Sequence, residues 1–99
     1  MANVILSRDA YRDLVEIVDY GEAQFGREAA DAYQDAIDRA FERRLGSYPR
    51  SGEARPRFGR NVRCLLCNRH RILYEFGNDT LVVLRILHHS RDVQRHLAK

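Results

Sequence analysis

The sequence is poor in several residue types: it has no tryptophan, one methionine, two prolines and only one lysine. No apolar stretch approaches the roughly 20 residues that a membrane-spanning helix requires, and the first residues lack the charged and then apolar pattern of a secretory signal. We therefore expect a cytoplasmic protein with no membrane contact. Its 99 residues suffice for one two-layer core but are too few for two such cores, which predicts a single domain over residues 1–99.

Cysteine is also scarce, since only Cys64 and Cys67 are present, in a CxxC pattern. They fall on a predicted strand, where positions three apart face opposite sides and lie about 10 Å apart. That separation is too large for one metal ion or one disulfide, and no second cysteine pair exists. We expect two small buried or half-buried thiols in a reducing compartment, with no metal site and no cofactor.

The basic residues are unevenly distributed, and almost all of them are arginine. Residues 1–49 contain six arginines and ten acids, whereas residues 50–99 contain ten arginines and one lysine against four acids. The halves therefore carry net charges of −4 and +7. Arginine pairs bidentately with carboxylate or phosphate. We expect the basic half to meet either nucleic acid or an acidic polypeptide, although some of these arginines only balance the acidic helices.

Three strand-like runs follow one another over residues 62–67, 70–76 and 80–88, and tight turns join them. Alternation separates Ile72, Tyr74 and Phe76 from Arg71, Leu73 and Glu75; Val62, Cys64 and Leu66 from Arg63, Leu65 and Cys67; and Val82, Leu84 and Ile86 from Leu81, Val83, Arg85 and Leu87. Both faces therefore carry large aliphatic side chains. An antiparallel sheet usually has one packed face, so the second face needs a cover, either the chain's own tail or a partner.

The first half of the sequence predicts a strand and two helices. Val4–Leu6 is a short apolar run, and Ser7 or Asp9 can cap the helix that follows it. Apolar residues recur at helical spacing over residues 8–25 and again over residues 27–46, with a glycine between the two segments. This pattern predicts a helical hairpin whose apolar stripes pack in the core rather than against a cofactor.

The segment Tyr48–Asn61 is rich in proline, glycine and arginine, and it is long for a connection in so small a domain. It is either an arginine-bearing contact loop or a linker between the layers. The chain closes with residues 90–98, where Ser90 or Asp92 can cap a short helix. The order β-α-α-β-β-β, with a short C-terminal helix or tail, predicts an α+β fold in which an α-helical hairpin packs on a mainly antiparallel sheet. The sequence does not place the first strand in that sheet.

Four phrases of the sequence occur together: Tyr48-Pro49-Arg50-Ser51-Gly52, Arg57-Phe58-Gly59 before Val62-Arg63, Arg71-Ile72-Leu73-Tyr74, and the run from Val83 to Asp92. With the order of elements, they resemble the ParE branch of the RelE/ParE toxin superfamily over essentially the whole chain. The last phrase is the most specific, because a strand followed by His-x-x-Arg-Asp recurs in that branch.

This resemblance implies a toxin of a bacterial type II toxin–antitoxin pair, which inhibits DNA gyrase by binding and which a ParD-like antitoxin neutralises. Antitoxin tails of such systems are typically acidic and amphipathic, and they fold as they bind. A surface with leucines between arginines suits such a ligand. We expect the antitoxin to cover the surplus apolar surface or the adjoining groove at the helical hairpin. The predicted antitoxin-binding residues are Arg63, Leu65, Arg71, Leu73, Val83, Arg85 and Leu87.

The alternative within the same fold is a RelE-like ribosome-dependent mRNA endoribonuclease. Such an enzyme needs acid–base groups and a cationic cluster at the scissile phosphate. The residues that this chain offers for these roles are Arg63, Arg71, Arg85 and His88. The nuclease branch commonly has lysines on the sheet and a tyrosine in the tail, whereas here the only lysine is Lys99 and no tyrosine follows Tyr74. We therefore favour a binding inhibitor that is not an enzyme.

The end of the chain supplies the candidate contacts with the target. These residues are His88, His89, Arg91, Asp92 and Arg95. The two adjacent histidines face opposite ways on a strand and cannot share a metal ion. Arg91 and Asp92 have an alternative role, as a local ion pair that fixes the tail. A plain nucleic-acid-binding module is disfavoured, because both predicted helices are acidic on their outer faces and the arginine face has no aromatic stacking platform.

Overall fold

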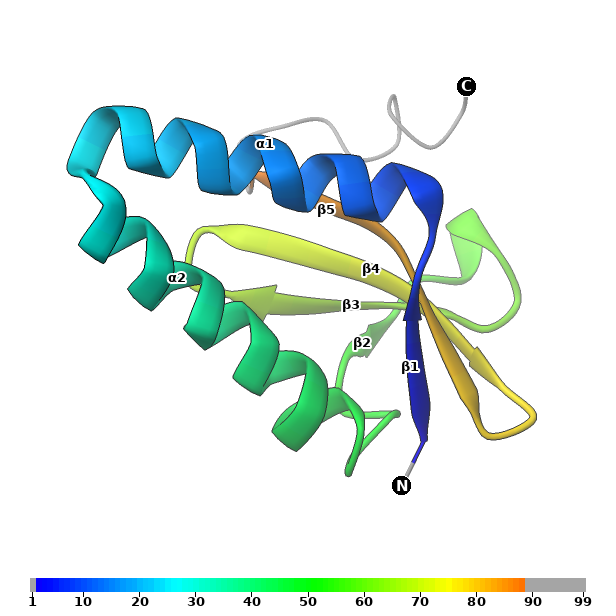
Figure 1. The fold of residues 1–99 in the computed structure, drawn as a ribbon. Coiled ribbons are helices and arrows are strands. Elements are labelled where there is room, and N and C mark those ends of the chain that lie inside the picture. Colours follow the sequence, from blue (N-terminus) through cyan, green and yellow to red (C-terminus); the bar gives the residue numbers. More distant parts are fainter. Residues whose placement is uncertain (1, 89–99) are drawn as a thin grey trace.

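The computed structural model describes residues 2–88, which form a layer of two helices on a five-stranded sheet (Figure 1). Strand β1 pairs parallel to β5, and the other neighbouring strands are antiparallel. The strands are β1 Asn3–Leu6, β2 Glu53–Ala54, β3 Val62–Cys67, β4 His70–Gly77 and β5 Thr80–His88, and they are ordered β1-β5-β4-β3-β2 across the sheet.

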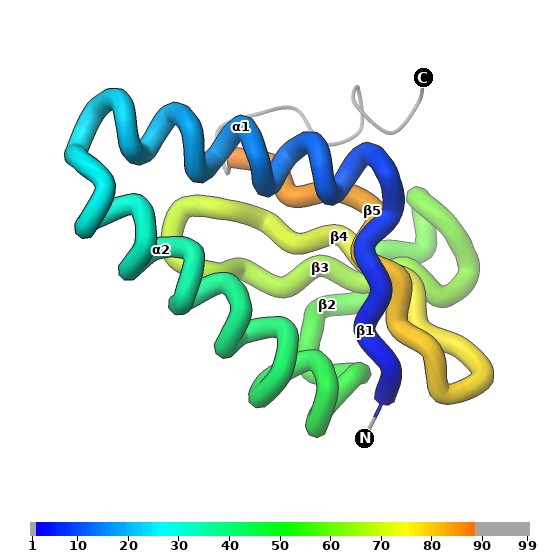
Figure 2. Tube along the Cα trace, in the orientation of Figure 1, coloured from blue at the N-terminus to red at the C-terminus, as the bar shows by residue number. Residues whose placement is uncertain are grey.

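The helical hairpin consists of α1, Arg8–Phe25, and α2, Arg27–Arg39, which continues as a π-helical turn over Ala40–Leu45. Ser7 caps α1, because its hydroxyl oxygen accepts a hydrogen bond from the backbone nitrogen of Ala10 at 3.0 Å. Gly26 joins the helices with φ at 91°, a backbone conformation that favours glycine. The trace in Figure 2 shows α1 running alongside β5, with the two helices diverging from their junction.

The predicted α+β architecture is confirmed, with two additions. The first strand lies at the sheet edge beside β5, a position that the sequence left open. The long connection after the helices contains β2 and a 3-10 helix, Pro56–Phe58. Sequence periodicity missed β2 because two residues are too few to show alternation. The helix predicted after residue 90 lies outside the described residues.

The main core lies between the helices and the sheet. Its buried members are Ala10, Ile37, Ala40, Phe41, Leu45, Leu65, Cys67, Ile72, Tyr74, Leu81, Val83 and Ile86. The hydroxyl oxygen of Tyr74 accepts a hydrogen bond from the backbone nitrogen of Gly52 at 2.9 Å. A β-carbon on Gly52 would lie 2.6 Å from that oxygen, so this close approach requires glycine. The core thereby holds the long loop against the sheet.

The alternation of side chains changes in the middle of β5. Tyr74 of β4 pairs with Val83, but the register then shifts so that Leu84 is an extra residue. Such a bulge reverses the faces of all later residues in the strand. Ile86 therefore packs in the helical core with Val83, while Leu87 belongs to the opposite face. The sequence-based assignment of Ile86 and Val83 to different faces is wrong, because alternation alone does not reveal an inserted residue.

A second, smaller cluster lies on the opposite face of the sheet. It consists of Val62, Cys64, Leu73 and Leu87, with Phe58 and Leu84 packed against it. The exposed fraction of these four buried side chains is between 0% and 9%, so the chain itself covers much of this face. The two free thiols lie in different clusters, Cys64 here and Cys67 under the helices, which confirms the prediction of two separate buried cysteines.

Candidate functional site

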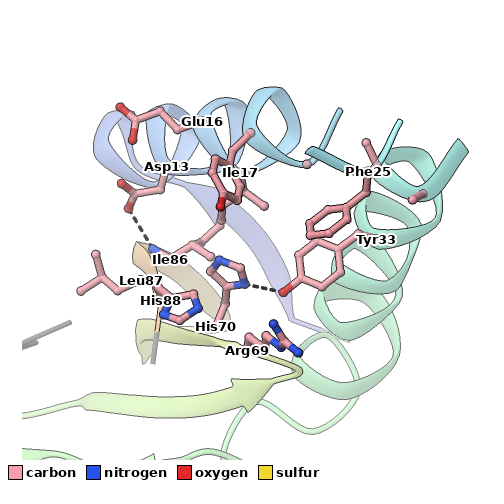
Figure 3. Close-up of a pocket in the computed structure, with 14 residues that line it drawn as sticks. Asp13, Glu16, Ile17, Phe25, Tyr33, Arg69, His70, Ile86, Leu87 and His88 are labelled. Carbon is pink, nitrogen blue, oxygen red and sulfur yellow. Dashed lines mark hydrogen bonds between the residues drawn. The ribbon is translucent and has the colours of Figure 1, made fainter. Parts of the chain in front are cut away.

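A cleft of about 850 Å³ lies between the helical hairpin and the ends of β4 and β5 (Figure 3). This volume is within the range of ligand-binding sites in proteins. Small residues near the helix junction allow α1 and α2 to approach there, since a β-carbon on Gly21 would meet that of Ala30 at 3.7 Å. The lining residues are Asp13, Glu16, Ile17, Tyr20, Gly21, Phe25, Ala29, Ala30, Tyr33, Arg69, His70, Ile86, Leu87 and His88.

Large aromatic side chains form the outer wall of the cleft. Tyr20 and Phe25 of α1 expose 64% and 71% of their surface, although burial of side chains this large is strongly favourable. Ile17 and Ile86 extend the apolar lining inward toward the core. A concave surface with exposed aromatic walls is typical of a site that another molecule covers.

Polar side chains gather at the strand ends of the cleft. The Tyr33 hydroxyl and His70 Nδ1 are hydrogen-bonded to each other, and the rings of His70 and His88 meet edge to face with centroids 5.5 Å apart (Figure 3). Burial raises the pKa of Tyr33 above its ordinary value, and the nearby Cys67 adds to this rise. Tyr33 therefore remains a neutral phenol at physiological pH. Together with Arg69, this cluster gives the cleft a polar rim at the strand ends.

Asp13, at the opposite end of the cleft, forms a part-buried ion pair with Arg85. Asp13 of α1 accepts hydrogen bonds from Arg85 Nε at 2.7 Å, from Arg85 Nη2 at 3.0 Å and from the backbone nitrogen of Ile86 at 2.9 Å. The hydrogen bond with Asp13 raises the pKa of Arg85. This carboxylate thus fixes α1 to the outer edge of β5 and neutralises one of the predicted antitoxin-binding arginines.

The seven residues predicted to bind the antitoxin occupy different parts of the sheet. Leu65 and Val83 are buried under the helices. Leu73 and Leu87 are buried in the cluster on the other face, although Leu87 also borders the cleft. The sheet therefore does not bring these four apolar side chains together on one open surface.

The remaining two arginines have separate environments. Arg63 Nη1 donates hydrogen bonds to the carbonyl oxygens of Gly52 at 2.9 Å and Arg50 at 3.2 Å, so this guanidinium holds the long loop. Arg71 lies beside the cross-strand Leu66, whose side chain is 58% exposed, in a hollow on the outer face. The loop that was predicted to be either a contact or a linker is thus attached to the sheet by Arg63.

Of the predicted target contacts, only His88 belongs to the described residues, and it lies in the cleft. His89, Arg91, Asp92 and Arg95 lie outside residues 2–88. Within that range, no three His, Cys, Asp or Glu side chains are grouped closely enough to hold a metal ion. Neither of the described helices has both the length and the apolarity that a membrane crossing requires.

Sequence reasoning missed the aromatic and histidine side chains that meet in the cleft. Phe25 and Tyr33 belong to the apolar patterns of residues 8–25 and 27–46, which predicted core stripes, and His70 is not among the predicted site residues. Counting back from the two-residue turn at Asn78-Asp79 places His70 opposite Leu87, but the bulge moves its partner to His88. The hairpin register alone therefore places His70 within one residue of its true partner, His88.

Comparisons with known proteins agree with this fold. The chain matches the family model of the ParE toxin of the type II toxin–antitoxin system parDE over residues 4–93. It is similar to a solved structure described as a chromosomal ParDE TA system from P. aeruginosa, with 25% sequence identity and a TM-score of 0.71 over 89% of this chain and 96% of that chain. No match was found among curated protein sequences.

A second solved structure, the toxin–antitoxin complex RelBE2 from Mycobacterium tuberculosis, is 22% identical with a TM-score of 0.64, over 88% of this chain and 96% of that chain. It supports the fold alone. The fold, together with the match to the family model, defines a small α+β toxin of the ParE/RelE superfamily. Because the family model spans most of the sequence, the chain belongs to the ParE family of type II toxin–antitoxin toxins, as its sequence phrases indicated.

Proposed function

We propose that this toxin inhibits DNA gyrase by binding it, without chemistry of its own, and that a ParD-like antitoxin neutralises it. Membership of the ParE family is the observation that carries the proposal. The likeness to the ParDE structure, at 25% identity, supports a ParD-like partner for this chain. The proposed place of action is the cytoplasm, and the proposed functional unit is the single domain over residues 1–99.

The cleft is the part of the surface best suited to an antitoxin tail. Its exposed aromatic walls, Tyr20 and Phe25, offer apolar area for the hydrophobic side of an amphipathic segment. The polar rim at the strand ends, which includes Arg69, His70 and His88, faces the same space and suits the polar side of such a segment. This location corresponds to the groove at the helical hairpin that the sequence offered as one of two antitoxin surfaces.

The other predicted antitoxin residues take supporting roles in this proposal. Leu65, Leu73 and Val83 are buried and shape the sheet rather than contact the antitoxin. Leu87 borders the cleft, and Arg71 beside the exposed Leu66 provides a second contact on the outer face for an antitoxin tail that continues around the sheet. The proposed gyrase contacts remain His88, His89, Arg91, Asp92 and Arg95.

The arrangement of the candidate catalytic residues supports binding over RNA cleavage. A ribonuclease must bring its cations and its acid–base groups to one phosphate. Here Arg63 binds loop carbonyls and Arg85 binds Asp13. Arg71 pairs across the strands with Leu87, whereas His88 pairs with His70 in the cleft, so these two side chains lie on opposite faces. The four residues therefore do not converge.

The proposed function is tested with purified full-length toxin and purified bacterial DNA gyrase. We expect the toxin to block the supercoiling of relaxed plasmid or to trap cleaved DNA, and to leave mRNA on translating ribosomes intact. A ParD-like antitoxin in excess should restore supercoiling. Cleavage of the ribosome-bound mRNA with normal supercoiling would instead support the ribonuclease alternative.

The antitoxin site is tested with two exposed aromatic residues. Phe25→Ala removes an aromatic wall of the cleft, and Tyr48→Ala removes a side chain of similar exposure, 69% against 71%, outside the cleft. We expect Phe25→Ala to weaken antitoxin affinity at least about tenfold, because a central aromatic ring in an interface carries much of the binding energy. Isothermal titration calorimetry provides the measurement. Equal affinities for both variants would contradict a binding site in the cleft.

A further inference from the structure

Helix α1 has a second apolar stripe that no part of the described structure covers. Tyr11, Val15 and Val18 follow one another at helical spacing, with 62% of Tyr11 and 41% of Val15 exposed and Val18 partly exposed. Each of them lies two residues along the helix from Asp13 or Tyr20, and hence on the other side of α1 from these two cleft residues. An amphipathic surface helix normally has one apolar stripe, directed to the core. This second stripe therefore needs a separate explanation.

The charged side chains beside this stripe have the same sign as the helix dipole at each end of α1, which is unfavourable. Arg8 and Arg12 lie near the positive N-terminal end of α1, and Asp19 and Glu22 lie near its negative C-terminal end. All four side chains are exposed. The salt bridges found within residues 2–88 join Arg55 with Glu53 and Arg85 with Asp13, so none of these four takes part in one. Within its own helix the arrangement is unfavourable.

An antiparallel copy of the same helix makes this arrangement favourable. The basic end of each helix then lies against the acidic end of the other, and the two helix dipoles oppose one another. We propose that the α1 stripe is a dimerisation surface whose partner is a second copy of this chain, related by a two-fold axis close to Val15. Closed two-fold dimers of this kind use the same patch on both subunits.

The spacing of the residues satisfies this symmetry. Arg8 lies seven residues before Val15 and Glu22 seven residues after it, so an axis at Val15 places Arg8 of one copy opposite Glu22 of the other. Tyr11 and Asp19 are each four residues from Val15 and also come opposite each other. A two-fold axis generates each of these contacts twice. The apolar centre supplies the buried area, and the charged ends fix the antiparallel direction.

The dimer surface and Tyr20 of the proposed antitoxin cleft lie on different sides of α1. A dimer therefore leaves Tyr20 accessible to an antitoxin. The competing explanation is that the stripe itself binds the antitoxin or another protein. A second copy is preferred because the complementary charges are present within this one helix, at equal distances from Val15.

The proposal is tested by sedimentation equilibrium of the full-length chain at increasing concentration. We expect a reversible monomer–dimer equilibrium in the wild type and a monomer for Val15→Asp, with unchanged circular dichroism because the site is on the surface. Arg8→Glu or Glu22→Arg alone should weaken dimerisation about tenfold, since each change replaces two attractive pairs by two repulsive ones.

Mixing the two single variants provides the decisive measurement. An equimolar mixture of Arg8→Glu and Glu22→Arg should form heterodimers at least as well as the wild type forms homodimers, because both cross-pairs become attractive again. A chain that stays monomeric at all concentrations would overturn the proposal. So would a dimer unaffected by Val15→Asp, or a mixture that associates no better than either variant alone. Lost antitoxin binding in Val15→Asp without any wild-type dimer would assign the stripe to the antitoxin and would likewise overturn it.

Discussion

The first half of β5, Thr80–Val83, has a strand on each side. The second half, Leu84–His88, has β4 on one side and the side chains of Ser7 and Asp13 on the other. In the first half, the β1 ladder ends where the backbone nitrogen of Ser7 donates to the carbonyl oxygen of Val83 at 2.9 Å. Beyond that point, the Ser7 hydroxyl donates to the carbonyl oxygen of Leu84, and Asp13 accepts from the backbone nitrogen of Ile86.

This difference explains why the cleft forms beside the second half of the strand. An edge strand must have its backbone groups paired or covered, and here two side chains cover it without a further strand. The missing strand leaves space between α1, α2 and the strand ends, into which Tyr33, His70 and His88 extend (Figure 3). The first half of β5 thus serves the stability of the fold, and the second half provides the surface for a partner.

The largest loss of stability should come from a substitution in the first half of β5. Leu81 is fully buried, so Leu81→Ala should lower the free energy of unfolding by about 2–5 kcal/mol, because it removes packed methyl groups and leaves a cavity. Leu84 at the bulge is only partly buried, and Leu84→Ala should cost about 1 kcal/mol. Urea denaturation measures both changes. Equal losses would show that the two halves are not packed differently.

A somewhat smaller loss of stability should come from a substitution at the edge of the second half of β5. Asp13→Ala leaves the Arg85 guanidinium and the Ile86 amide without their acceptor, which should lower the free energy of unfolding by about 2–3 kcal/mol. Asp31→Ala, at an exposed acidic position of α2, is the matched control and should change it by less than about 0.5 kcal/mol.

The double variant Asp13→Ala/Arg85→Ala sharpens this test. It removes the unpaired charge along with the carboxylate, so it should be no less stable than Asp13→Ala. If the double variant instead loses the sum of two large single effects, Arg85 must stabilise the fold by contacts other than Asp13. The measured coupling between the two positions therefore reports how far this edge depends on one ion pair.

The smallest change in stability should appear at alkaline pH. Burial raises the pKa values of Cys64, Cys67 and Tyr74 in the folded chain above their ordinary values of 9.0 for the thiols and 10.0 for the phenol. Between the unfolded and folded pKa values, the unfolded chain binds fewer protons, so stability falls as pH rises. Urea midpoints should therefore be constant from pH 7 to near 9 and then decline. The variant Cys64→Ala/Cys67→Ala should show a later decline, and a decline that begins at the same pH would contradict the thiol contribution.

The sequence predicted the elements well where each has a periodic pattern. The helical hairpin, the Ser7 cap and the three C-terminal strands follow from helical and alternating spacing, and all are confirmed. The site was harder to predict because the cleft depends on the inserted Leu84, which leaves no trace in the pattern of apolar residues. Asp13 also gave no signal, because on an acidic helix face a carboxylate that reaches a strand edge is indistinguishable from one in solvent.

The most direct test of the cleft as the partner surface is amide hydrogen exchange of the full-length toxin, alone and in complex with a ParD-like antitoxin. We expect slower exchange on binding at the cleft positions Tyr20, Tyr33, His70 and His88, with no change over Thr80–Val83, which the core already protects. New protection confined to the outer face around Leu66 and Arg71, with the cleft unchanged, would contradict this expectation.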